Sequence, residues 1–365
     1  MQRWTAIGVL AVGLVGCRAP GPEVVSAVEI GTLEQSEAID GRDGGGSALA
    51  WGRSVWVYGD TVLTVPDEQG RNWHHNSYSI TDDLDASDGI TGFVEPLDSA
   101  GAPQHFIPPS PAEQAFNDAH YGDDCLEEPC GARYAVWPSE PFFDEARDRA
   151  LVFYGLIYAE PGDFNFSGVG QSLAIWDDPD GRPVRPVIDP EAEHPDLLFG
   201  PDDPAWGTAS AIVDDLLYTF ACDGDDGPGH RCRLARVGVE SIHQRSAWQF
   251  WTADGWSADM GAADVLFEGA PIMSLSWSRF LDAWLVVYSA PFASEIVGRT
   301  ASELTGPWSR EGVLYDAGDD APYDAMHHPE YEEGDGRVQY ITYSRHTSGW
   351  FGTEFPIIRV EFAAP

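Results

Sequence analysis

Apolar residues along this chain fall in short runs of alternating or aromatic character, separated by Gly- and Pro-rich turns. The sequence contains 39 Gly and 27 Pro, and no long stretch has the 3.6-residue period of an amphipathic helix. Short apolar runs bounded by turn residues are typical of β-strands. The pattern therefore predicts an all-β fold.

The runs form a unit that recurs five times: a strand-like segment, a polar turn, an aromatic-rich strand and one more short strand. The first two strands of the units are predicted at 46–51 and 54–58, 134–143 and 150–154, 206–213 and 216–220, 272–277 and 283–288, and 326–331 and 338–343. The third strands are predicted at 76–80, 171–175, 233–237, 295–299 and 357–361. Repeated antiparallel units that cannot bury their faces alone indicate a β-propeller, here with five blades.

The last unit contains only three strands before the sequence ends. A strand at 24–30 is predicted to complete it and to close the ring. The predicted organisation is thus an N-terminal segment with the closing strand at 17–39 and a single propeller domain at 40–365. Long insertions at 95–132 and 178–205 are predicted to build one rim of a site, because inserted loops often carry function.

The N-terminus has the features of an export signal. Arg3 precedes an apolar stretch at 4–16, which is too short to span a bilayer as a mature helix. It ends in Leu-Val-Gly before Cys17, which resembles the bacterial lipobox, in which the cysteine is lipidated and becomes the new N-terminus. We expect a signal peptide at 1–16 and a lipid on Cys17; the alternative is an ordinary signal peptide with a chance cysteine. Because Arg18 stands where an Asp would favour the inner membrane, the expected location is the cell envelope, at the outer membrane or cell surface.

The charge and composition of the chain limit the binding partners that can be expected. The chain has 60 acidic and 20 basic residues, a formal net charge of -40. Such a chain repels nucleic acid and anionic lipid headgroups, so no nucleic acid is expected and the membrane is expected to be reached through the lipid anchor only. The 14 Trp, 13 Tyr and 17 Phe supply enough apolar surface for a core, which argues against disorder.

Four cysteines remain after Cys17. An even number in an exported chain indicates two disulfides. Short separations favour the local pairs Cys125–Cys130 and Cys222–Cys232. A zinc site is the alternative, but the spacing lacks a CxxC pair.

Polar residues early in the first strand of each blade are the candidates for chemistry, because these strands line the channel of a propeller. The candidates are Asp43, Trp137, Glu140, Trp206, Ser274, Ser276, His327, His328 and Glu330. Asp43 precedes three glycines, and Asp60 ends the paired strand, so both acids are predicted to face one end of the channel. Two carboxylates facing a cleft are what glycoside hydrolysis needs. The alternative is that each Asp only forms a turn.

Other candidate side chains are ambiguous. Trp137 and Trp206 suit stacking on sugar rings, although tryptophans in propellers often pack between blades. Neighbouring strand residues point to opposite faces, so at most one of His327 and His328 faces the channel. We favour His328 with Glu330, although a structural histidine fits equally well. No metal-ligand motif is found, and the acids are compatible with a bound Ca²⁺ although no EF-type loop is present.

Several segments together resemble a known family. They are the Arg-Asp-Gly-Gly-Gly-Ser at 42–47 with Val-Trp-Val-Tyr-Gly-Asp-Thr at 55–61, Trp-Gly-Thr-Ala at 206–209, the aromatic run at 276–308, and His-Pro-Glu at 328–330 with Ile-Thr-Tyr-Ser-Arg at 341–345. They are similar to a bacterial five-bladed β-propeller family, long catalogued as a domain of unknown function, that includes endo-D-arabinanases. The resemblance covers most of 40–362.

The resemblance implies a glycosidase-like propeller with an oligosaccharide or polysaccharide as partner and with Asp43 and Asp60 as the catalytic pair. Trp137, Glu140, Trp206, Ser274, His328 and Glu330 are the expected substrate-binding residues. The expected function is hydrolysis of arabinofuranosyl-type or related polysaccharides by an exported lipoprotein. The alternative is a non-catalytic carbohydrate-binding or scaffold lipoprotein.

Overall fold

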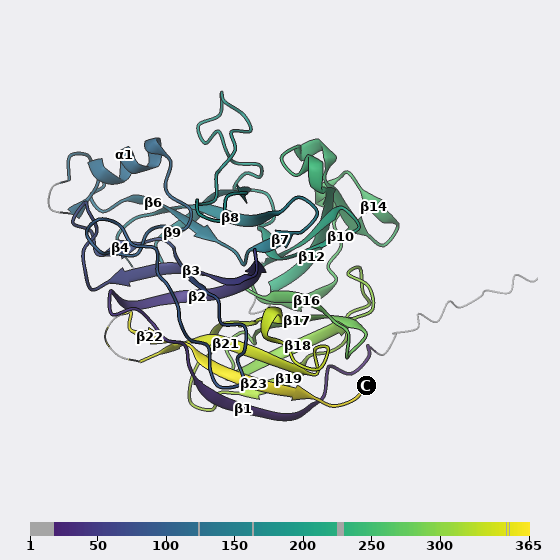
Figure 1. The fold of residues 1–365 in the computed structure, drawn as a ribbon. Coiled ribbons are helices and arrows are strands. Elements are labelled where there is room, and N and C mark those ends of the chain that lie inside the picture. The colour runs from purple at the N-terminus through teal and green to yellow at the C-terminus, as the bar shows by residue number, and fades with distance from the viewer. Residues whose placement is uncertain (1–17, 123–124, 163, 225–229, 348, 350) are drawn as a thin grey trace, which may run out of the picture.

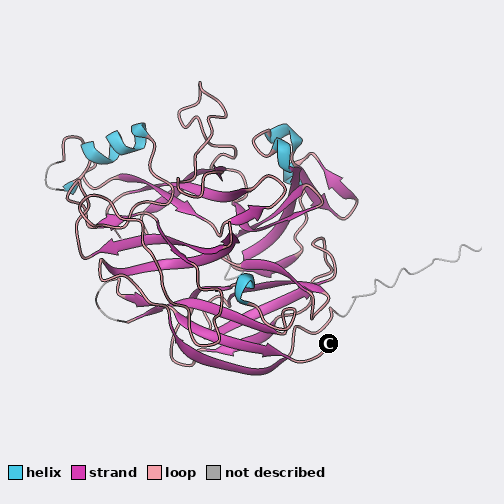
Figure 2. Ribbon diagram, in the orientation of Figure 1, coloured by secondary structure: helices cyan, strands magenta, loops and turns pink. Residues whose placement is uncertain are grey.

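The fold is a ring of antiparallel sheets. The computed structural model describes residues 18–122, 125–162, 164–224, 230–347, 349 and 351–365. Across these residues the strands form five sheets, arranged around a common centre as the blades of a propeller (Figure 1). Figure 2 shows that strands dominate and that helices are few and short. The predicted all-β, five-bladed propeller is confirmed, while the predicted signal peptide at 1–16 and Cys17 lie outside the described residues.

The first three blades follow one another in sequence. Blade one contains β2 (Ile39–Ala50), β3 (Arg53–Leu63), β4 (Trp73–His74) and β5 (Ser77–Thr81). Blade two contains β6 (Arg133–Pro138), β7 (Phe142–Asp144), β8 (Arg149–Ala159) and β9 (Phe166–Trp176). Blade three contains β10 (Trp206–Val213), β11 (Leu216–Asp223), β12 (His230–Gly238), β13 (Gln249–Thr252), β14 (Gly255–Ser257) and β15 (Phe267–Gly269).

The last two blades complete the circle. Blade four contains β16 (Ser274–Ser278), β17 (Ala283–Ser289), β18 (Glu295–Ala301) and β19 (Gly312–Asp316). Blade five contains β20 (Tyr323–His327), β21 (Val338–His346), β22 (Thr353–Glu354), β23 (Pro356–Phe362) and β1 (Val24–Thr32). The helices are α1 (Pro111–Ala119) and the 3₁₀ turns η2 (Val239–Ser241), η3 (Arg245–Ala247), η4 (Met260–Ala262) and η5 (Pro329–Tyr331).

One predicted strand is partly wrong. The run at 326–331 does not stay extended, because η5 begins at Pro329 directly after β20 ends at His327. Proline at the first helical position has a fixed φ that suits a helical turn and lacks the N–H that a strand ladder needs.

The ring is closed by the N-terminal strand, as predicted. β1 pairs antiparallel with β23, with Val24 opposite Phe362 and Thr32 opposite Pro356. The innermost strands contact one another in circular order: β2 with β7, β7 with β10, β10 with β16, β16 with β20 and β20 with β2. Every blade therefore has two neighbours, and no blade face is left at an open end of the array.

The core lies between the blades, because the strands are apolar on both faces. In β3, Val55 and Val57 pack in a cluster with residues of blade two, whereas Trp56 and Tyr58 pack with residues of blade five. Successive strand side chains point to opposite faces, so one strand supplies two separate cores. Similar clusters join blades two and three, three and four, and four and five. This is why the hairpin strands appear in the sequence as continuous aromatic and β-branched runs.

The long insertions fasten to each other rather than to the channel. The Arg185 guanidinium forms two hydrogen bonds of 2.7 Å with the Glu113 carboxylate of α1, and a third of 2.5 Å with Asp196. α1 itself starts with a capping box between Ser110 and Glu113, which satisfies backbone donors at the helix start. These buried charges are paired and hydrogen-bonded, which is the condition for burying them at low cost.

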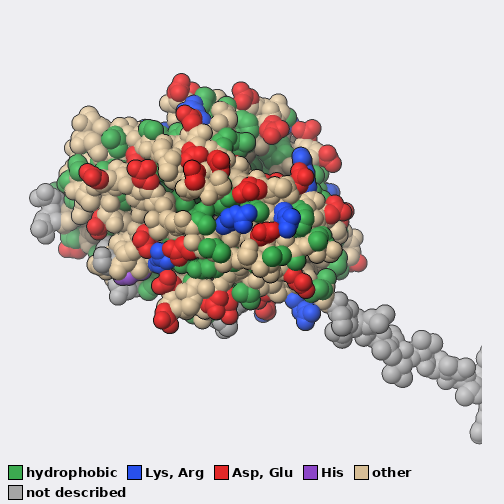
Figure 3. Space-filling view, turned by 60° about the horizontal axis from the view of Figure 1, so that its bottom comes forward, with side chains coloured by type: hydrophobic (Ala, Val, Ile, Leu, Met, Phe, Trp, Pro, Cys, Tyr) green, Lys and Arg blue, Asp and Glu red, His purple; other side chains and the backbone are tan. Residues whose placement is uncertain are grey.

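Two disulfides join the predicted local pairs. Cys125 is bonded to Cys130, and Cys222 is bonded to Cys232 across the β11–β12 hairpin. No described helix is long and apolar enough to cross a membrane. The face viewed in Figure 3 carries many acidic side chains and fewer basic ones, in keeping with the excess of acidic residues in the sequence.

Candidate active site

The first strands of the blades converge on a cavity of about 600 Å³. Its wall contains Asp43 to Gly46 of β2, Trp137 to Glu140 between β6 and β7, Trp206 to Thr208 of β10, Met273 before β16, and Tyr323, Asp324 and Met326 of β20. None of the described residues of 95–132 lines it, and Ala205 is the one lining residue from 178–205. The prediction that both insertions build the rim is wrong for this cavity, because they are fastened on each other.

Asp43 is placed by an irregularity in the β2–β3 pairing. The register shifts between Arg42 and Gly44 and again between Gly44 and Gly46. Gly44 and Gly45 have φ of 78° and 106°, values that side chains with a Cβ rarely adopt. The Asp43 carboxylate lies against Gly59, where any side chain would collide with Oδ1, and accepts a hydrogen bond from the backbone N–H of Asp60. The glycines thus position Asp43, as β-bulges near active sites often do for a side chain.

Asp60 lies beside Asp43 and is held by nitrogen donors. Its Oδ1 accepts a hydrogen bond of 3.0 Å from the indole nitrogen of Trp73 and one of 3.4 Å from that of Trp137. The Nδ1 of His75 is 3.8 Å from the same oxygen. An indole N–H can only donate, so Asp60 Oδ1 is the acceptor in both hydrogen bonds.

A third acid in the cavity, Asp324, was not among the residues predicted from the sequence. Asp324 is buried, and its φ of 56° lies in the left-handed region, where a non-glycine residue carries backbone strain. Its carboxylate accepts a hydrogen bond from the backbone N–H of Gly44. A strained, buried carboxylate on a cavity wall is a common feature of functional sites.

Asp43 and Asp324 therefore share one poorly solvated space, with Asp60 next to Asp43. Burial raises the pKa of Asp43 well above its usual value, and the charges of Asp60 and Asp324 raise it further. Burial also raises the pKa of Asp324 to about 8. The pKa of the Tyr323 hydroxyl is raised by the charge of Asp324, by burial and by Asp43 and Asp60. Like charges at close range are relieved by retaining protons, so the group holds at least one proton near neutral pH.

The acids do not form a set of metal ligands. Within the described part of the chain, no group of three or more His, Cys, Asp or Glu side chains could hold a metal ion. The compatibility with Ca²⁺ stays a prediction without an assigned site.

Glu140 also lines the cavity and lies against β2. It follows Pro138, where the pairing of β6 with β8 ends before β7 resumes it at Phe142. The Glu140 backbone and Cβ pack so closely on Gly46 that a side chain there would lie 3.0 Å from Cβ of Glu140. Burial raises the pKa of Glu140 well above its usual value, and the charge of Glu330 adds to this.

The two predicted tryptophans have different surroundings. Trp137 packs edge-on against Phe166, with ring centroids 5.1 Å apart, and both rings line the cavity. Trp206 is only 2 % exposed and packs on Phe250 in the core between blades two and three. Trp137 and Phe166 therefore offer the larger aromatic surface beside Asp60.

Ser274, His328 and Glu330 lie outside the cavity lining and connect blades. Ser47 of blade one donates to the Glu330 carboxylate at 2.6 Å, and its oxygen is 2.6 Å from His328 Nδ1. Ser54 also donates to Glu330, and the hydroxyl of Thr342 lies 2.8 Å from His328 Nε2. We refer to Ser47, Ser54, His328, Glu330 and Thr342 as the closure network, because they join blade five to blade one.

The neighbouring histidine joins blade five to blade four. His327 lies 2.5 Å from the Ser274 hydroxyl through Nδ1 and 2.7 Å from the Ser276 hydroxyl through Nε2. Burial lowers the pKa of His327 to about 3 and that of His328 well below its usual value. The two histidines thus point to opposite neighbours, as strand alternation predicts. The roles of Ser274, His328 and Glu330 in substrate binding stay predictions.

Comparison with known proteins supports the fold. Residues 189–351 match the model of a family described as a domain of unknown function, DUF4185. This stretch is similar to the DUF4185 family. The DUF4185 match includes Trp206, Asp324 and His328, whereas Asp43 and Asp60 precede it. The resemblance to a propeller family of formerly unknown function is confirmed, and no curated protein matches the chain significantly.

Solved structures similar to this chain include carbohydrate-active enzymes. A Bacteroides ovatus protein described as a candidate hydrolase has a TM-score of 0.57 at 13% identity, over 91% of this chain and 87% of its own. An exo-β-1,3-galactanase from Phanerochaete chrysosporium, solved with β-1,3-galactotriose, has a TM-score of 0.51 at 10% identity, over 91% of this chain and 63% of its own. An N-acetylgalactosamine deacetylase from F. plautii, in complex with blood group B trisaccharide, has a TM-score of 0.50 at 12% identity, over 95% of each chain. At these sequence identities, the comparison shows only that this chain and the three proteins share a fold.

Proposed function

We propose that this protein is a glycoside hydrolase that uses Asp43 and Asp60 in the cavity at the first strands. The observation that carries the proposal is that Asp43 lines a cavity with an aromatic wall, next to Asp60, which accepts a hydrogen bond from the cavity-lining Trp137. Glycoside hydrolysis needs one carboxylic acid to protonate the leaving oxygen and one carboxylate to activate water or attack the sugar.

The surroundings assign the roles. Asp43 has its pKa raised by burial and by two neighbouring acids, so it keeps a proton that it can donate to the leaving oxygen. Asp60 accepts hydrogen bonds from two indole N–H groups, which stabilise the negative charge that a base or nucleophile carries. Asp324 accepts the Gly44 N–H and helps to keep the shared proton in the group.

The proposed substrate class is an arabinofuranosyl-type or related polysaccharide. Trp137 and Phe166 would stack on a sugar ring next to Asp60, because an aromatic face packs well on the apolar face of a sugar. We also propose that the chain is exported, that Cys17 carries a lipid and that the propeller is held at the outer membrane or cell surface. Mass spectrometry of the mature N-terminus tests the lipid.

The decisive experiment measures oligosaccharide release by the chain from residue 18 onward on a panel of polysaccharides that includes arabinans. Asp43→Asn and Asp60→Asn are expected to lower the rate about 10²–10⁴-fold, since each removes a proton-transfer or nucleophilic group. Asp40→Asn is the matched control, because Asp40 is an exposed acid on the same strand. Its rate should equal that of the unmodified chain.

Two results would contradict the proposal. If the Asp43→Asn and Asp60→Asn variants both fold and both keep full activity, the reaction takes place elsewhere. Glycan binding without any cleavage would instead favour a carbohydrate-binding lipoprotein, in which the aromatic wall matters more than the acids.

A further inference from the structure

A second hollow of about 650 Å³ adjoins the acid cavity. It lies between blades four and five and extends from the turn that follows β17 to the residues that precede β20. The two hollows share lining residues, which are His230, Pro271, Ile272, Tyr323 and Asp324. The two hollows are therefore adjacent and share a wall that includes Asp324.

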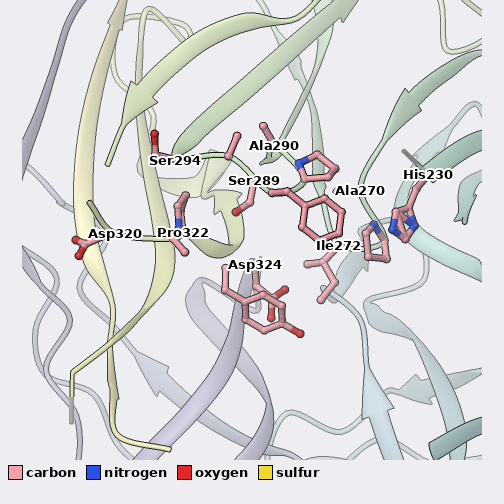
Figure 4. A pocket seen from close by; sticks show the side chains of 15 residues that line it. His230, Ala270, Ile272, Ser289, Ala290, Ser294, Asp320, Pro322 and Asp324 are labelled. Atoms are coloured by element: carbon pink, nitrogen blue, oxygen red, sulfur yellow. The ribbon is translucent and has the colours of Figure 1, made fainter. Parts of the chain in front are cut away.

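The lining of this hollow is mostly apolar, with polar groups at its edge. Figure 4 shows Ala270, Ile272, Ala290 and Pro322 around the space, with Asp324 at one side. Ser289, Ser294 and Asp320 add oxygen atoms around the same space. An apolar wall with a few hydroxyl and carboxylate groups suits a sugar, which has apolar C–H faces and a rim of hydroxyls.

Phe292 is the most unusual residue of the lining. It is 94% exposed, and its φ of 59° lies in the left-handed region, where a non-glycine residue carries backbone strain. Neither feature stabilises the folded chain, since the ring buries almost no surface and the backbone is strained. An aromatic ring at the edge of an apolar hollow offers a face that packs on the apolar face of a sugar. Tyr323, which is 55% exposed, provides a second ring where the two hollows meet.

The charges limit what such a ligand can be. The described residues that line the hollow include no Lys or Arg to attract an anion, and the chain as a whole carries a net charge of -40. Phosphate, sulfate or uronic acid groups would be repelled there. A neutral sugar is compatible with both the apolar wall and the acids.

We propose that the second hollow is a distal subsite for a neutral glycan. Phe292 stacks on sugar units of this glycan, while the glycosidic bond that is cleaved in the same glycan lies at Asp43 and Asp60. This rests on the proposed function. The two hollows have Tyr323 and Asp324 in common, and this adjacency is the reason for placing one glycan across both. The consequence is a preference for long substrates over short ones.

Chain-length dependence tests the subsite. Phe292→Ala is expected to lower kcat/KM on a soluble arabinan, or on its long oligosaccharides, about 5- to 10-fold, the size of an aromatic stacking interaction. Hydrolysis of oligosaccharides too short to reach the subsite should be unchanged. Phe164→Ala is the matched control, because Phe164 is also highly exposed, at 89%, and has a φ of 55°, but lines neither hollow.

Binding separates the subsite from the reaction. Electrophoresis through gels that contain arabinan measures how strongly each variant is retained by the polysaccharide. The variants compared are Asp43→Asn alone, Asp43→Asn with Phe292→Ala, and Asp43→Asn with Phe164→Ala. Weaker retention with Phe292→Ala only, together with the selective loss on long substrates, supports the subsite. Equal behaviour of the Phe292 and Phe164 variants overturns it, even if the chain is a hydrolase. If no polysaccharide is cleaved, the proposed function fails, but retention in the gel still tests the subsite. Retention that depends on Phe292 supports the subsite, and retention that does not depend on Phe292 overturns it.

Discussion

Two buried acidic groups lie close to each other in this propeller, and they differ in how their charges are compensated. In the closure network, the Glu330 carboxylate accepts hydrogen bonds from Ser47 and Ser54. Because the Ser47 hydroxyl gives its one proton to Glu330, it must accept from Nδ1–H of His328, whose Nε2 then accepts from Thr342. Each polar group in this chain of contacts has a partner.

The acid cavity is built in the opposite way. The charges of Asp60 and Asp324 raise the pKa of Asp43, and all three acids raise that of the Tyr323 hydroxyl. No basic side chain is among the described residues that line this cavity except His230, whose pKa is lowered by burial. Buried groups that serve stability are usually satisfied, whereas repulsion that is tolerated in a cavity indicates use in binding or chemistry. The difference separates a structural network from a candidate active site.

A substitution that displaces the Asp43 carboxylate should have the largest effect, a loss of catalytic rate. Gly59→Ala places a Cβ where Asp43 Oδ1 now lies, so the carboxylate must move. A displacement of about 1 Å can cost 10²-fold in rate, and the expected result is a loss of that order in kcat on the cleaved polysaccharide, with little change in Tm.

The matched control for this substitution is Gly31→Ala. Gly31 is also a strand glycine, but an added Cβ would meet no atom within 4 Å. Equal activity of the two variants would mean that the position of Asp43 is not critical.

Breaking the closure network should reduce stability instead of activity. Ser47→Ala removes the hydroxyl that serves both Glu330 and His328. Leaving buried polar groups unsatisfied costs about 1–3 kcal/mol, so thermal or urea unfolding should show a loss of that size in the free energy of unfolding. Ser99→Ala, which removes an exposed hydrogen bond to Glu68, is expected to change it by less than about 0.5 kcal/mol. A neutral Ser47→Ala would show that the network contributes nothing to ring closure.

The smallest effect concerns the pH dependence of stability. The pKa of Asp324 is raised from 3.8 to about 8, so between these values the folded chain keeps a proton that the unfolded chain releases. The stability tied to this group is full below pH 3.8 and is lost as the pH rises towards 8. Asp324→Asn cannot ionise and should raise Tm near pH 8 by about 3–6 °C relative to the unmodified chain.

At about pH 3 the difference should vanish, because Asp324 is then largely protonated in both states. The exposed Asp319→Asn serves as the control. A difference in Tm that does not change with pH would contradict the raised pKa.

The sequence predicted the propeller well because its blades depend on local patterns. β10 has the predicted bounds of 206–213, and the closing strand pairs as expected with β23. The long β2 was predicted only in part, since its register shifts at Gly44 and Gly46 have no periodic signature. α1 was missed inside an insertion, although Ser110, Pro111 and Glu113 form a recognisable capping box.

The candidate site could be predicted only where local turns mark it. Asp43 and Asp60 stand next to glycines, and this drew attention to them. Asp324 has no such mark, because its left-handed backbone and its hydrogen bond from Gly44 arise from contacts between distant blades. Glu330 and His328 have the right residue types for a site, but only the three-dimensional packing reveals that Ser47 and Ser54 use them to join blades.

The pairing of β1 with β23 has a consequence for how the chain folds. During synthesis from the N-terminus, residues 24–32 emerge more than 300 residues before their partner at 356–362. Until then β1 is an edge strand without a neighbour, and such edges are sites of aggregation. Bringing these ends together closes a loop of almost the whole chain, which slows folding more than it weakens the final state. The propeller should therefore reach its closed form only after β23 is available. Because β23 pairs with both β1 and β21, its removal would leave each of these two strands with an unpaired edge.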